Sequence, residues 1–234
     1  MFACKCCKRE PGIARNSSIT AKLVTDQGPD PVGLIQAVSL VPGRVKDIAA
    51  KIGDLEKQGA KKLVLDLRRC STGSDEDGVA LANLFIDKGL LTYTQGQKTT
   101  RQDFQASASK AITKLPLVVL VNRGTAGAAE IAAAALLDSK RAELVGEKTY
   151  GDASIRKAIT MDDGSAVILS VAKYYSPSGI AIQDKGVTPG SQVAEAEVAS
   201  TDDDDDADAP SAAAAPNVKP GDPVLMKAYE ILKK

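Results

Sequence analysis

Histidine is absent from all 234 residues of the sequence, and this absence restricts the chemistry open to the chain. Ser-His-Asp and Cys-His catalysis both need an imidazole, and so does the zinc-binding helix with the pattern His-Glu-x-x-His. These three classes of active site are therefore excluded. A hydrolase built on this chain needs another base, and a lysine with a lowered pKa or a carboxylate are the remaining common choices.

Cysteine is also scarce, with Cys4, Cys6, Cys7 and Cys70 as the whole set. Three of the four lie close together near the N-terminus, but their spacing matches no standard Cys-x-x-Cys pair. We therefore expect no metal site, and no motif indicates a cofactor. Cys70 falls in a predicted loop, where a thiol can react, but none of its sequence neighbours indicates reactivity.

An excess of either charge is missing, since 30 Lys and Arg balance 30 Asp and Glu. The balance gives no indication of nucleic acid as a partner. Negative charge is concentrated in Asp202–Asp206 and Asp208, which we interpret as a solvated spacer rather than a contact for a basic partner. No apolar run approaches the roughly 20 residues needed to cross a bilayer, and residues 1–10 show no secretory signal.

The pattern of apolar residues divides the chain into four parts. Residues 1–17 show no periodicity and are interpreted as a disordered end, whereas 18–193 have the composition of one sizeable α/β core. Residues 194–217 are an acidic linker of Ala, Asp and Pro with too little apolar material to offset the entropy of ordering. In 218–234, Asp222-Pro223 is expected to cap a helix over Val224–Leu232 that docks on the core.

Within the core, apolar strands alternate with amphipathic helices, which is typical of parallel βαβ units. We expect strands over 18–24, 33–40, 61–67, 117–121 and around 144–145, and helices after Gly43, through Ala80–Phe85 and over 128–137. Two hairpins are also expected, one pairing 90–94 with 101–104 and one pairing 155–160 with 166–174 across an Asp-Gly turn. The sheet is therefore predicted to be mixed.

The strand, turn and helix over 117–137 are the clearest place for chemistry. Small residues in the turn allow a backbone or a ligand to approach closely, and a helix N-terminus offers unpaired N–H groups. Many acyl-transfer enzymes place a nucleophile at such a turn. The alternative interpretation is that small residues only permit tight packing of the helix on the sheet.

Five segments resemble, in the same order, the catalytic core of the tail-specific or C-terminal processing peptidases. They are GLIQAVSLVPGRVKDIAAKI, KKLVLDLRRCSTGS, PLVVLVNRGTAGAAEIAAAAL, LVGEKTYGDASIRKAI and DDGSAVILSVAKYYSPSGIAIQDKGVTP, which together cover about residues 18 to 190. The resemblance implies a ClpP/crotonase-like α/β fold and descent from a serine-type endopeptidase with a lysine base, a pair suited to a chain without histidine.

The resemblance also implies partners and a location. Family members act on C-terminal tails of exported or envelope proteins, so C-terminal or unfolded polypeptide segments are the expected partners and a periplasmic or extracytoplasmic place is the expected location. The family usually carries a PDZ-type peptide-binding module before the core. Only one candidate strand precedes Gly33, so we expect such a module, if present, to lie upstream of this sequence.

The chain departs from the family at the residues that carry catalysis. The nucleophilic serine lies three residues before a glutamate, and with Glu130 as that glutamate the position holds Gly127. The lysine follows the glycine of a Tyr-Gly turn, where this chain has Asp152. Arg156 stands where a glutamine is common. The resemblance thus makes these four residues the vestige of a catalytic site.

The peptide and oxyanion pocket is altered as well. The family has two adjacent glycines after the Leu-Asp-Leu-Arg strand, and here Thr72 replaces the first while Gly73 remains. The resemblance places Gly73 and Ala128 in this pocket. Asp152 and Arg156 have a structural interpretation too, since an exposed ion pair between them would contribute little to stability.

These observations favour a catalytically degenerate relative, a pseudopeptidase that retains a role in peptide binding or assembly. The alternative is an active serine- or threonine-type endopeptidase that uses Thr125 or Ser154 as an atypical nucleophile. Thr125 is better explained as the N-cap of the following helix. A crotonase-like acyl-thioester enzyme is a third interpretation, against which the hairpin-rich end argues.

Overall fold

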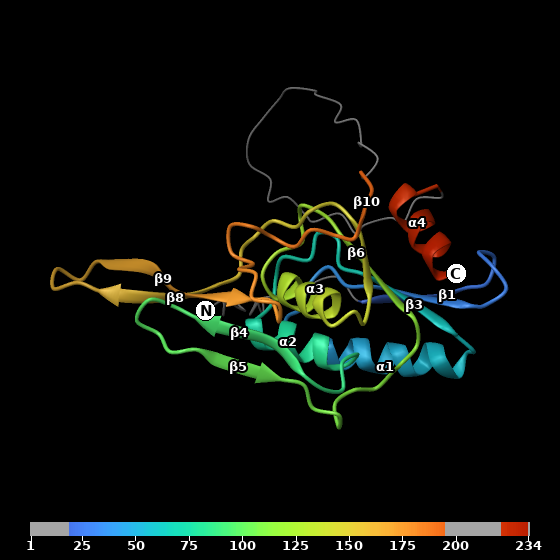
Figure 1. The fold of residues 1–234 in the computed structure, drawn as a ribbon, viewed down its shortest axis with the longest axis horizontal. Helices are drawn as coiled ribbons and strands as arrows, with labels where there is room; N and C mark the ends of the chain where they lie inside the picture. The colour runs from blue at the N-terminus through green and yellow to red at the C-terminus, as the bar shows by residue number, and fades with distance from the viewer. Residues whose placement is uncertain (1–18, 195–220, 234) are drawn as a thin grey trace, which may run out of the picture.

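Two sheets form the framework of the protein. The computed structural model describes residues 19–194 and 221–233, so the predicted N-terminal end and nearly all of the acidic linker lie outside the described residues (Figure 1). One sheet has six strands in the order β1-β2-β3-β6-β7-β10, and the other has four in the order β5-β4-β9-β8. The strands are β1 Thr20–Val24, β2 Val32–Gln36, β3 Lys62–Asp66, β4 Leu90–Gln95, β5 Gln102–Gln105, β6 Leu117–Val121, β7 Glu143–Gly146, β8 Ser154–Thr160, β9 Ala166–Tyr175 and β10 Ser191–Gln192.

The mixed α/β architecture predicted from the sequence is confirmed. In the larger sheet β1 is antiparallel to β2 and every other neighbouring pair is parallel, whereas the smaller sheet is antiparallel throughout. Both predicted hairpins are present, as β4–β5 and β8–β9. The helices are α1 Arg44–Lys57, α2 Asp75–Asn83, α3 Ala128–Asp138 and α4 Pro223–Leu232.

The parallel strands are apolar on both sides because helices cover both faces of the sheet. Leu117, Val119 and Val121 of β6 contribute to the core that includes α1, α2 and α3. Val118 and Leu120, which point the other way, pack in a second core with α4. Figure 1 shows α4 alone on its side of the sheet. The predicted docking of the C-terminal helix is therefore confirmed.

Gly78 allows α2 to approach the start of α3 closely. A Cβ atom at this position would lie 2.3 Å from the carbonyl oxygen of Ala128, which is far inside van der Waals contact. Only glycine fits such a helix crossing without moving one of the backbones. The close contact fixes the N-terminal turn of α3, where the candidate site lies.

Two predicted boundaries were wrong. The strand expected over 33–40 ends at Gln36, because the amide of Leu40 leaves the sheet and donates instead to Thr72 in the loop after β3, at 2.6 Å. The helix expected through Phe85 ends at Asn83, whose side-chain amide donates to the carbonyl of Ile86 at 2.9 Å. In both places a long-range or side-chain hydrogen bond overrides the local apolar pattern.

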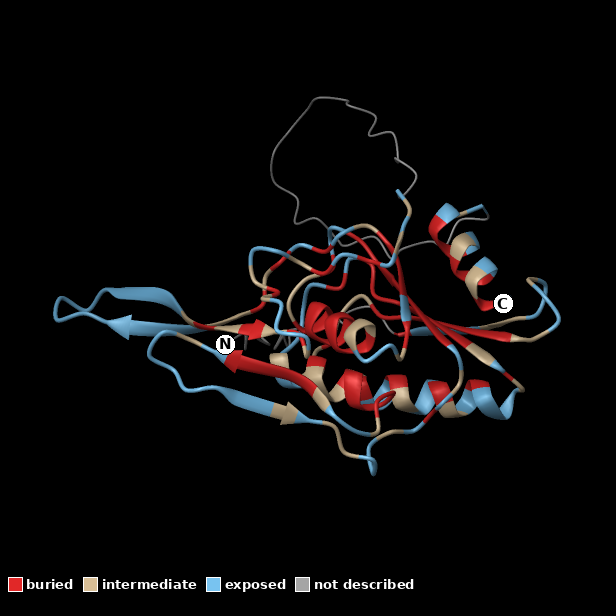
Figure 2. Ribbon diagram, in the orientation of Figure 1, coloured by how far each residue is buried: buried red, intermediate tan, exposed pale blue. Residues whose placement is uncertain are grey.

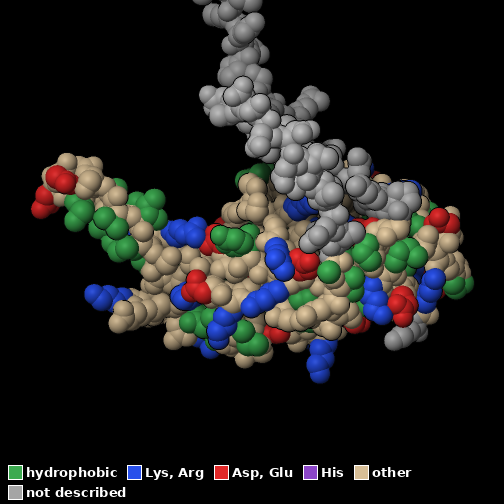
Figure 3. All heavy atoms as spheres, turned by 90° about the horizontal axis from the view of Figure 1, so that it is seen from above, with side chains coloured by type: hydrophobic (Ala, Val, Ile, Leu, Met, Phe, Trp, Pro, Cys, Tyr) green, Lys and Arg blue, Asp and Glu red, His purple; other side chains and the backbone are tan. Residues whose placement is uncertain are grey.

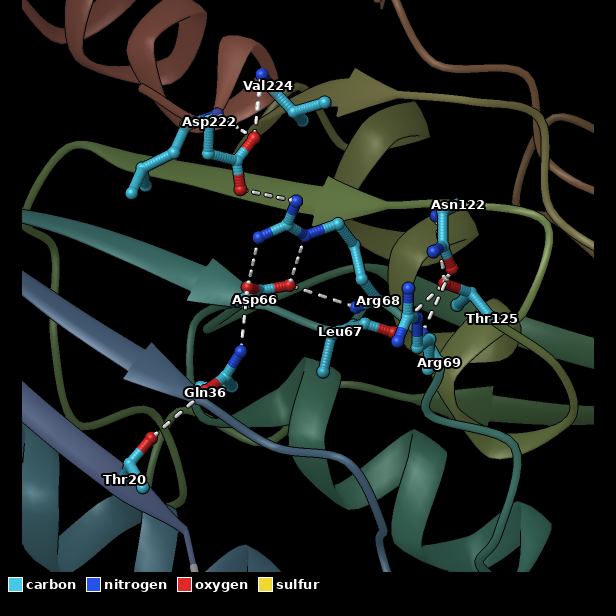
Figure 4. A network of polar contacts seen from close by, with 11 residues as sticks. Thr20, Gln36, Asp66, Leu67, Arg68, Arg69, Asn122, Thr125, Asp222 and Val224 are labelled. Carbon is cyan, nitrogen blue, oxygen red and sulfur yellow. Dashed lines mark hydrogen bonds and ion pairs between the residues drawn. The ribbon is translucent and has the colours of Figure 1, made fainter. Parts of the chain in front are cut away.

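A chain of polar contacts fastens α4 to the sheet (Figure 4). Asp222 accepts hydrogen bonds from the amides of Val224 and Leu225, as the predicted N-cap, and its other oxygen lies 2.7 Å from a guanidinium nitrogen of Arg68. Arg68 also pairs with the buried Asp66 at 2.8 Å. Burial alone would lower the pKa of Arg68, but the hydrogen bonds and charges of Asp66 and Asp222 raise it, so the ion remains charged.

The other end of α4 is held by Lys62 of β3. Its ammonium donates to the carbonyl of Leu232 at 2.6 Å and pairs with Asp30 at 2.9 Å. A cation suits this place because the last carbonyls of a helix are unsatisfied and carry partial negative charge. The helix is thus fixed at both ends as well as along its apolar face.

The β8–β9 hairpin extends away from the rest of the molecule (Figure 1), and most of its residues are exposed (Figure 2). We call the hairpin the arm.

Among the described residues, no helix is both long and apolar enough to cross a membrane.

Replacing Asp222 with alanine tests the attachment of α4. The substitution removes the N-cap and leaves the buried Arg68 with one carboxylate fewer, so we expect the free energy of unfolding to fall by about 2 to 4 kcal/mol in urea titration. Lys227→Ala breaks only the exposed pair between Lys227 and Glu230 and should change it by less than about 0.5 kcal/mol. Equal effects of the two substitutions would contradict this account of the attachment.

Candidate functional site

Gly127 occupies the turn between β6 and α3. Its φ of 61° and ψ of −123° lie in a region that side chains of L-residues enter only under strain. A strained strand-to-helix turn of this kind is where several hydrolases expose a nucleophile. Here the residue is glycine, which adopts the conformation without strain and brings no reactive atom. The turn thus has the backbone conformation of a nucleophile turn, and its central residue carries no side chain.

Gly127 and Asp152 face each other across the site. If Gly127 had a Cβ atom, the nearest atom outside the adjacent residues would be the backbone carbonyl oxygen of Asp152, at 3.8 Å. A side chain at position 127 would therefore have room and would extend toward the segment that carries Asp152. The structure brings together the two positions that sequence reasoning assigned to the nucleophile and the base.

Glu130 joins the two turns. Its buried carboxylate accepts hydrogen bonds from the amides of Gly151 at 2.7 Å, Asp152 at 2.8 Å and Gly127 at 3.2 Å, and from the hydroxyl of Thr149. Burial raises the pKa of Glu130, and these four hydrogen bonds act in the opposite direction. The sequence predicted that Glu130 is retained but missed this role, although a glutamate three residues after a helix N-cap is itself a signal.

Thr125 is not the N-cap of α3, and that prediction was wrong, since the N-cap is Gly127. The Thr125 side chain has no exposed surface. Its hydroxyl donates to the carbonyl of Leu67 at 2.9 Å and accepts from the amide of Asn122 at 3.1 Å (Figure 4). The chain turns once more before the helix begins, so the hydroxyl binds the end of β3 instead of α3.

The loop after β3 is fixed to the same turn. The amide of Ala126 donates to the carbonyl of Cys70 at 2.9 Å, and the amide of Arg69 donates to the side chain of Asn122 at 3.0 Å. The Cys70 side chain is buried, and burial raises the pKa of its thiol to about 12, so it is not a reactive thiolate near neutral pH.

Gly73 and Ala128 have packing functions in the structure. Gly73 has a φ of 148°, and a Cβ atom there would lie 2.7 Å from the carbonyl oxygen of Leu40, so glycine is required. Ala128 is the first residue of α3 and is buried against Gly78. Gly73 contacts the chain after β2, whereas Ala128 contacts α2.

Asp152 forms the predicted ion pair with Arg156, which belongs to β8. Both side chains are partly or largely exposed, so the pair contributes little to stability. Ser154 shares a hydrogen bond of 3.1 Å with Ser170 of β9. This local set of side chains, Asp152, Arg156, Ser154 and Ser170, contains no amine.

Further carboxylates surround this place. Burial raises the pKa of Asp75 at the start of α2, a hydrogen bond with Tyr174 lowers it, and the charges of Glu76 and Asp152 raise it. The charge of Arg156 lowers the pKa of Asp75 as well, so the charged groups near Asp152 are carboxylates and a guanidinium. Sequence reasoning missed Asp75 and Tyr174, because no local motif marks them. Within residues 19–194 and 221–233, no group of three or more His, Cys, Asp or Glu is arranged to hold a metal ion.

Glu130→Gln tests whether this side chain organises the site. An amide has one acceptor oxygen and directs its N–H groups at donors, so about 2 to 4 kcal/mol of the free energy of unfolding should be lost. Amide exchange at Gly151 and Asp152 should accelerate with it, as read by NMR. Glu230→Gln, at the exposed pair with Lys227, is the matched control and should leave both quantities unchanged. Protection of Gly151 and Asp152 that survives in Glu130→Gln would refute the role.

Asp152→Asn tests the electrostatic environment. Removing this charge should lower the pKa of Asp75, because one of the charges that raise it is gone and Arg156 loses its partner. NMR titration of the Asp75 carboxyl measures the change. Asp184→Asn removes an exposed carboxylate that pairs with Lys173 and should leave the pKa of Asp75 where it is. An unchanged value in Asp152→Asn would show that the two groups do not interact.

Comparisons with known proteins identify the family of the chain. Peptidase family S41 matches residues 32–193. The carboxyl-terminal-processing protease of Synechocystis is 37% identical over 177 residues, covering 76% of this chain and 41% of the relative. The carboxy-terminal processing protease CtpA of Bacillus subtilis is 38% identical over 178 residues, covering 76% of this chain and 38% of the relative. The chain thus spans about two fifths of the length of these relatives.

Solved structures show the same fold. The photosystem II D1 C-terminal processing protease superposes with a TM-score of 0.68 and 33% identity, covering 75% of this chain and 48% of that protein. Mature CPAF, with a TM-score of 0.60 and 14% identity, shares the fold alone. The family match includes β6, the turn at Gly127 and the whole arm. The chain belongs to peptidase family S41 and has the fold of the C-terminal processing proteases.

Proposed function

We propose that this chain is a catalytically degenerate member of its family that binds the C-terminal tails of polypeptides without cleaving them. The observation that carries the proposal is the turn at Gly127, whose φ of 61° and ψ of −123° are those of a nucleophile turn. A Cβ atom added there would lie 3.8 Å from the backbone carbonyl oxygen of Asp152. Hydrolysis by a serine and a lysine needs a hydroxyl and an amine at these two places. A hydrogen atom and a carboxylate occupy them instead.

The retained backbone supports binding rather than loss of all function. Glu130 still fixes both turns, and Gly73 still fixes the neighbouring loop against Leu40. Tyr150, next to the turn that Glu130 holds, is 72% exposed and offers an aromatic surface beside the site. An exposed strand edge, on β8, begins two residues after Asp152 and suits an extended peptide.

The partners and the location follow from the relatives. The relatives are named as proteases that process carboxyl termini, so tails of other polypeptides are the partner class we propose for this chain. A PDZ-type module elsewhere in the full polypeptide would add to recognition. Relatives include chloroplast and bacterial proteins, and for this chain we propose an extracytoplasmic or periplasmic place of action.

An atypical nucleophile has less support. The Thr125 hydroxyl is buried, donates to one backbone group and accepts from another, so attack would break the contacts that hold the turn. Ser154 lies beyond Asp152 on the arm and bonds to Ser170. No described hydrogen bond gives either hydroxyl a lysine as its base.

Incubation with an unstructured, fluorescently labelled polypeptide tests the loss of catalysis. Removal of a nucleophile costs on the order of 10⁶-fold in rate, so no fragment should form above the rate without protein, while the same tail should bind saturably. Thr125→Ala, Ser154→Ala and the matched Ser165→Ala should behave like the parent in the cleavage assay. Cleavage that Thr125→Ala or Ser154→Ala abolishes, and Ser165→Ala preserves, would establish an atypical nucleophile and overturn the proposal.

A further inference from the structure

The arm carries apolar side chains that the core does not cover. Its exposed large apolar residues are Ile159, Met161, Val167, Ile168 and Leu169, with Ile168 at 69% exposed. Figure 3 shows hydrophobic side chains gathered along the projecting arm and acidic ones at its tip. An isolated two-stranded ribbon is only marginally stable in water, so an apolar ribbon of this length indicates a partner.

The strand register sorts these side chains onto two faces. Lys157 pairs with Leu169 and Ile159 pairs with Val167, and paired residues of an antiparallel ladder share a face. The register shifts between Ile155 and Arg156, but the extra residue belongs to β9, so alternation along β8 itself still places Ile155 on the same face. Near the body, Ile155 pairs with the buried Ala172 and packs against the core. The apolar face of the arm is therefore the outward continuation of the core face of the smaller sheet.

β8 is also the outer strand of that sheet, in the order β5-β4-β9-β8. Its far edge has no strand partner within the described residues, and its seven residues contain no proline. Such an edge presents a row of backbone N–H and C=O groups to an incoming extended chain. Main-chain hydrogen bonds are thus available beside the apolar face.

Lys157 determines which chain suits the edge. It is an exposed cation between Ile155 and Ile159 on the apolar face, and among the described residues no hydrogen bond or ion pair holds its ammonium. Antiparallel pairing of β8 with a second copy would bring Lys157 and Arg156 of the two copies close together, which is destabilising. A strand that suits this face is therefore apolar and carries one carboxylate, which can pair with Lys157.

The edge leads to the site described above. β8 begins at Ser154, two residues after Asp152, and Lys157 lies five positions beyond Asp152. At about 3.3 Å per residue, the backbone of Lys157 lies roughly 16 Å from that of Asp152 along the chain. A chain whose carboxyl end reaches Lys157 would therefore place its residue about five positions earlier near Gly127.

We propose that the free edge of β8 binds the apolar carboxyl end of a polypeptide as an added, parallel strand, with its terminal carboxylate on Lys157 and alternate side chains against Ile155 and Ile159. This inference rests on the proposed function and specifies its ligand and its direction. The face accepts apolar residues at alternate positions, and the lysine distinguishes a chain end from an internal segment.

Fluorescence anisotropy with two ten-residue peptides tests the proposal. Both carry valine at alternate positions and an N-terminal fluorophore, and one ends in a free carboxylate while the other ends in an amide. We expect amidation to weaken binding to the parent protein about tenfold, as for a partly exposed charge pair. Lys157→Met should weaken binding of the free acid by the same factor and should bind both peptides equally. Lys51→Met, which replaces an exposed lysine of α1, should bind the two peptides with the same affinities as the parent.

The possible failures are distinguishable. If the free acid binds but neither amidation nor Lys157→Met weakens it, the edge of β8 is not the docking site, although tail binding itself stands. If neither peptide binds saturably to the parent, the proposed function fails as well. Because Lys157 is exposed, its replacement should leave the free energy of unfolding within about 0.5 kcal/mol of the parent, which a urea titration checks.

Discussion

The geometry of the candidate site depends on one buried carboxylate. Glu130 accepts hydrogen bonds from Gly127 on one turn and from Gly151 and Asp152 on the other, although the two turns are more than 20 residues apart in the sequence. A buried carboxylate is costly unless it is fully hydrogen-bonded, so the two turns and the glutamate stabilise one another. This interaction fixes the relative position of the two turns without any contribution from a side chain at position 127.

The residues that support the candidate site also hold the fold. Gly78 sets the distance between α2 and α3, and Thr125 ties the turn to the end of β3. Changing either would cost packing or buried hydrogen bonds, whereas glycine at 127 removes strain and Asp152 gains an ion pair with Arg156. The proposed loss of catalysis is therefore compatible with retention of the fold, and the proposed binding of polypeptide would give the retained fold a use.

Local patterns in the sequence predicted most of the architecture. The apolar run at 117–121, the Asp-Gly hairpin near 164 and the Asp222-Pro223 cap all fall where the structure has β6, the arm and the start of α4. What the sequence could not predict depends on contacts between distant segments. The hydroxyl of Thr125 binds Leu67 rather than α3, and Asp75 and Tyr174 reach the site from a helix and a strand with no motif between them. The facing positions 127 and 152 were predicted only through the family resemblance.

The account stands on the claim that no group at the turn before α3 can open a peptide bond. Incubation of the protein with a tailed polypeptide in water enriched in ¹⁸O, followed by mass spectrometry, measures this most directly, because each hydrolysis event labels a new carboxylate. The account predicts no labelled fragment above the level found without protein, even after long incubation. Labelled fragments that increase in proportion to the protein concentration and share one cleavage site would contradict it.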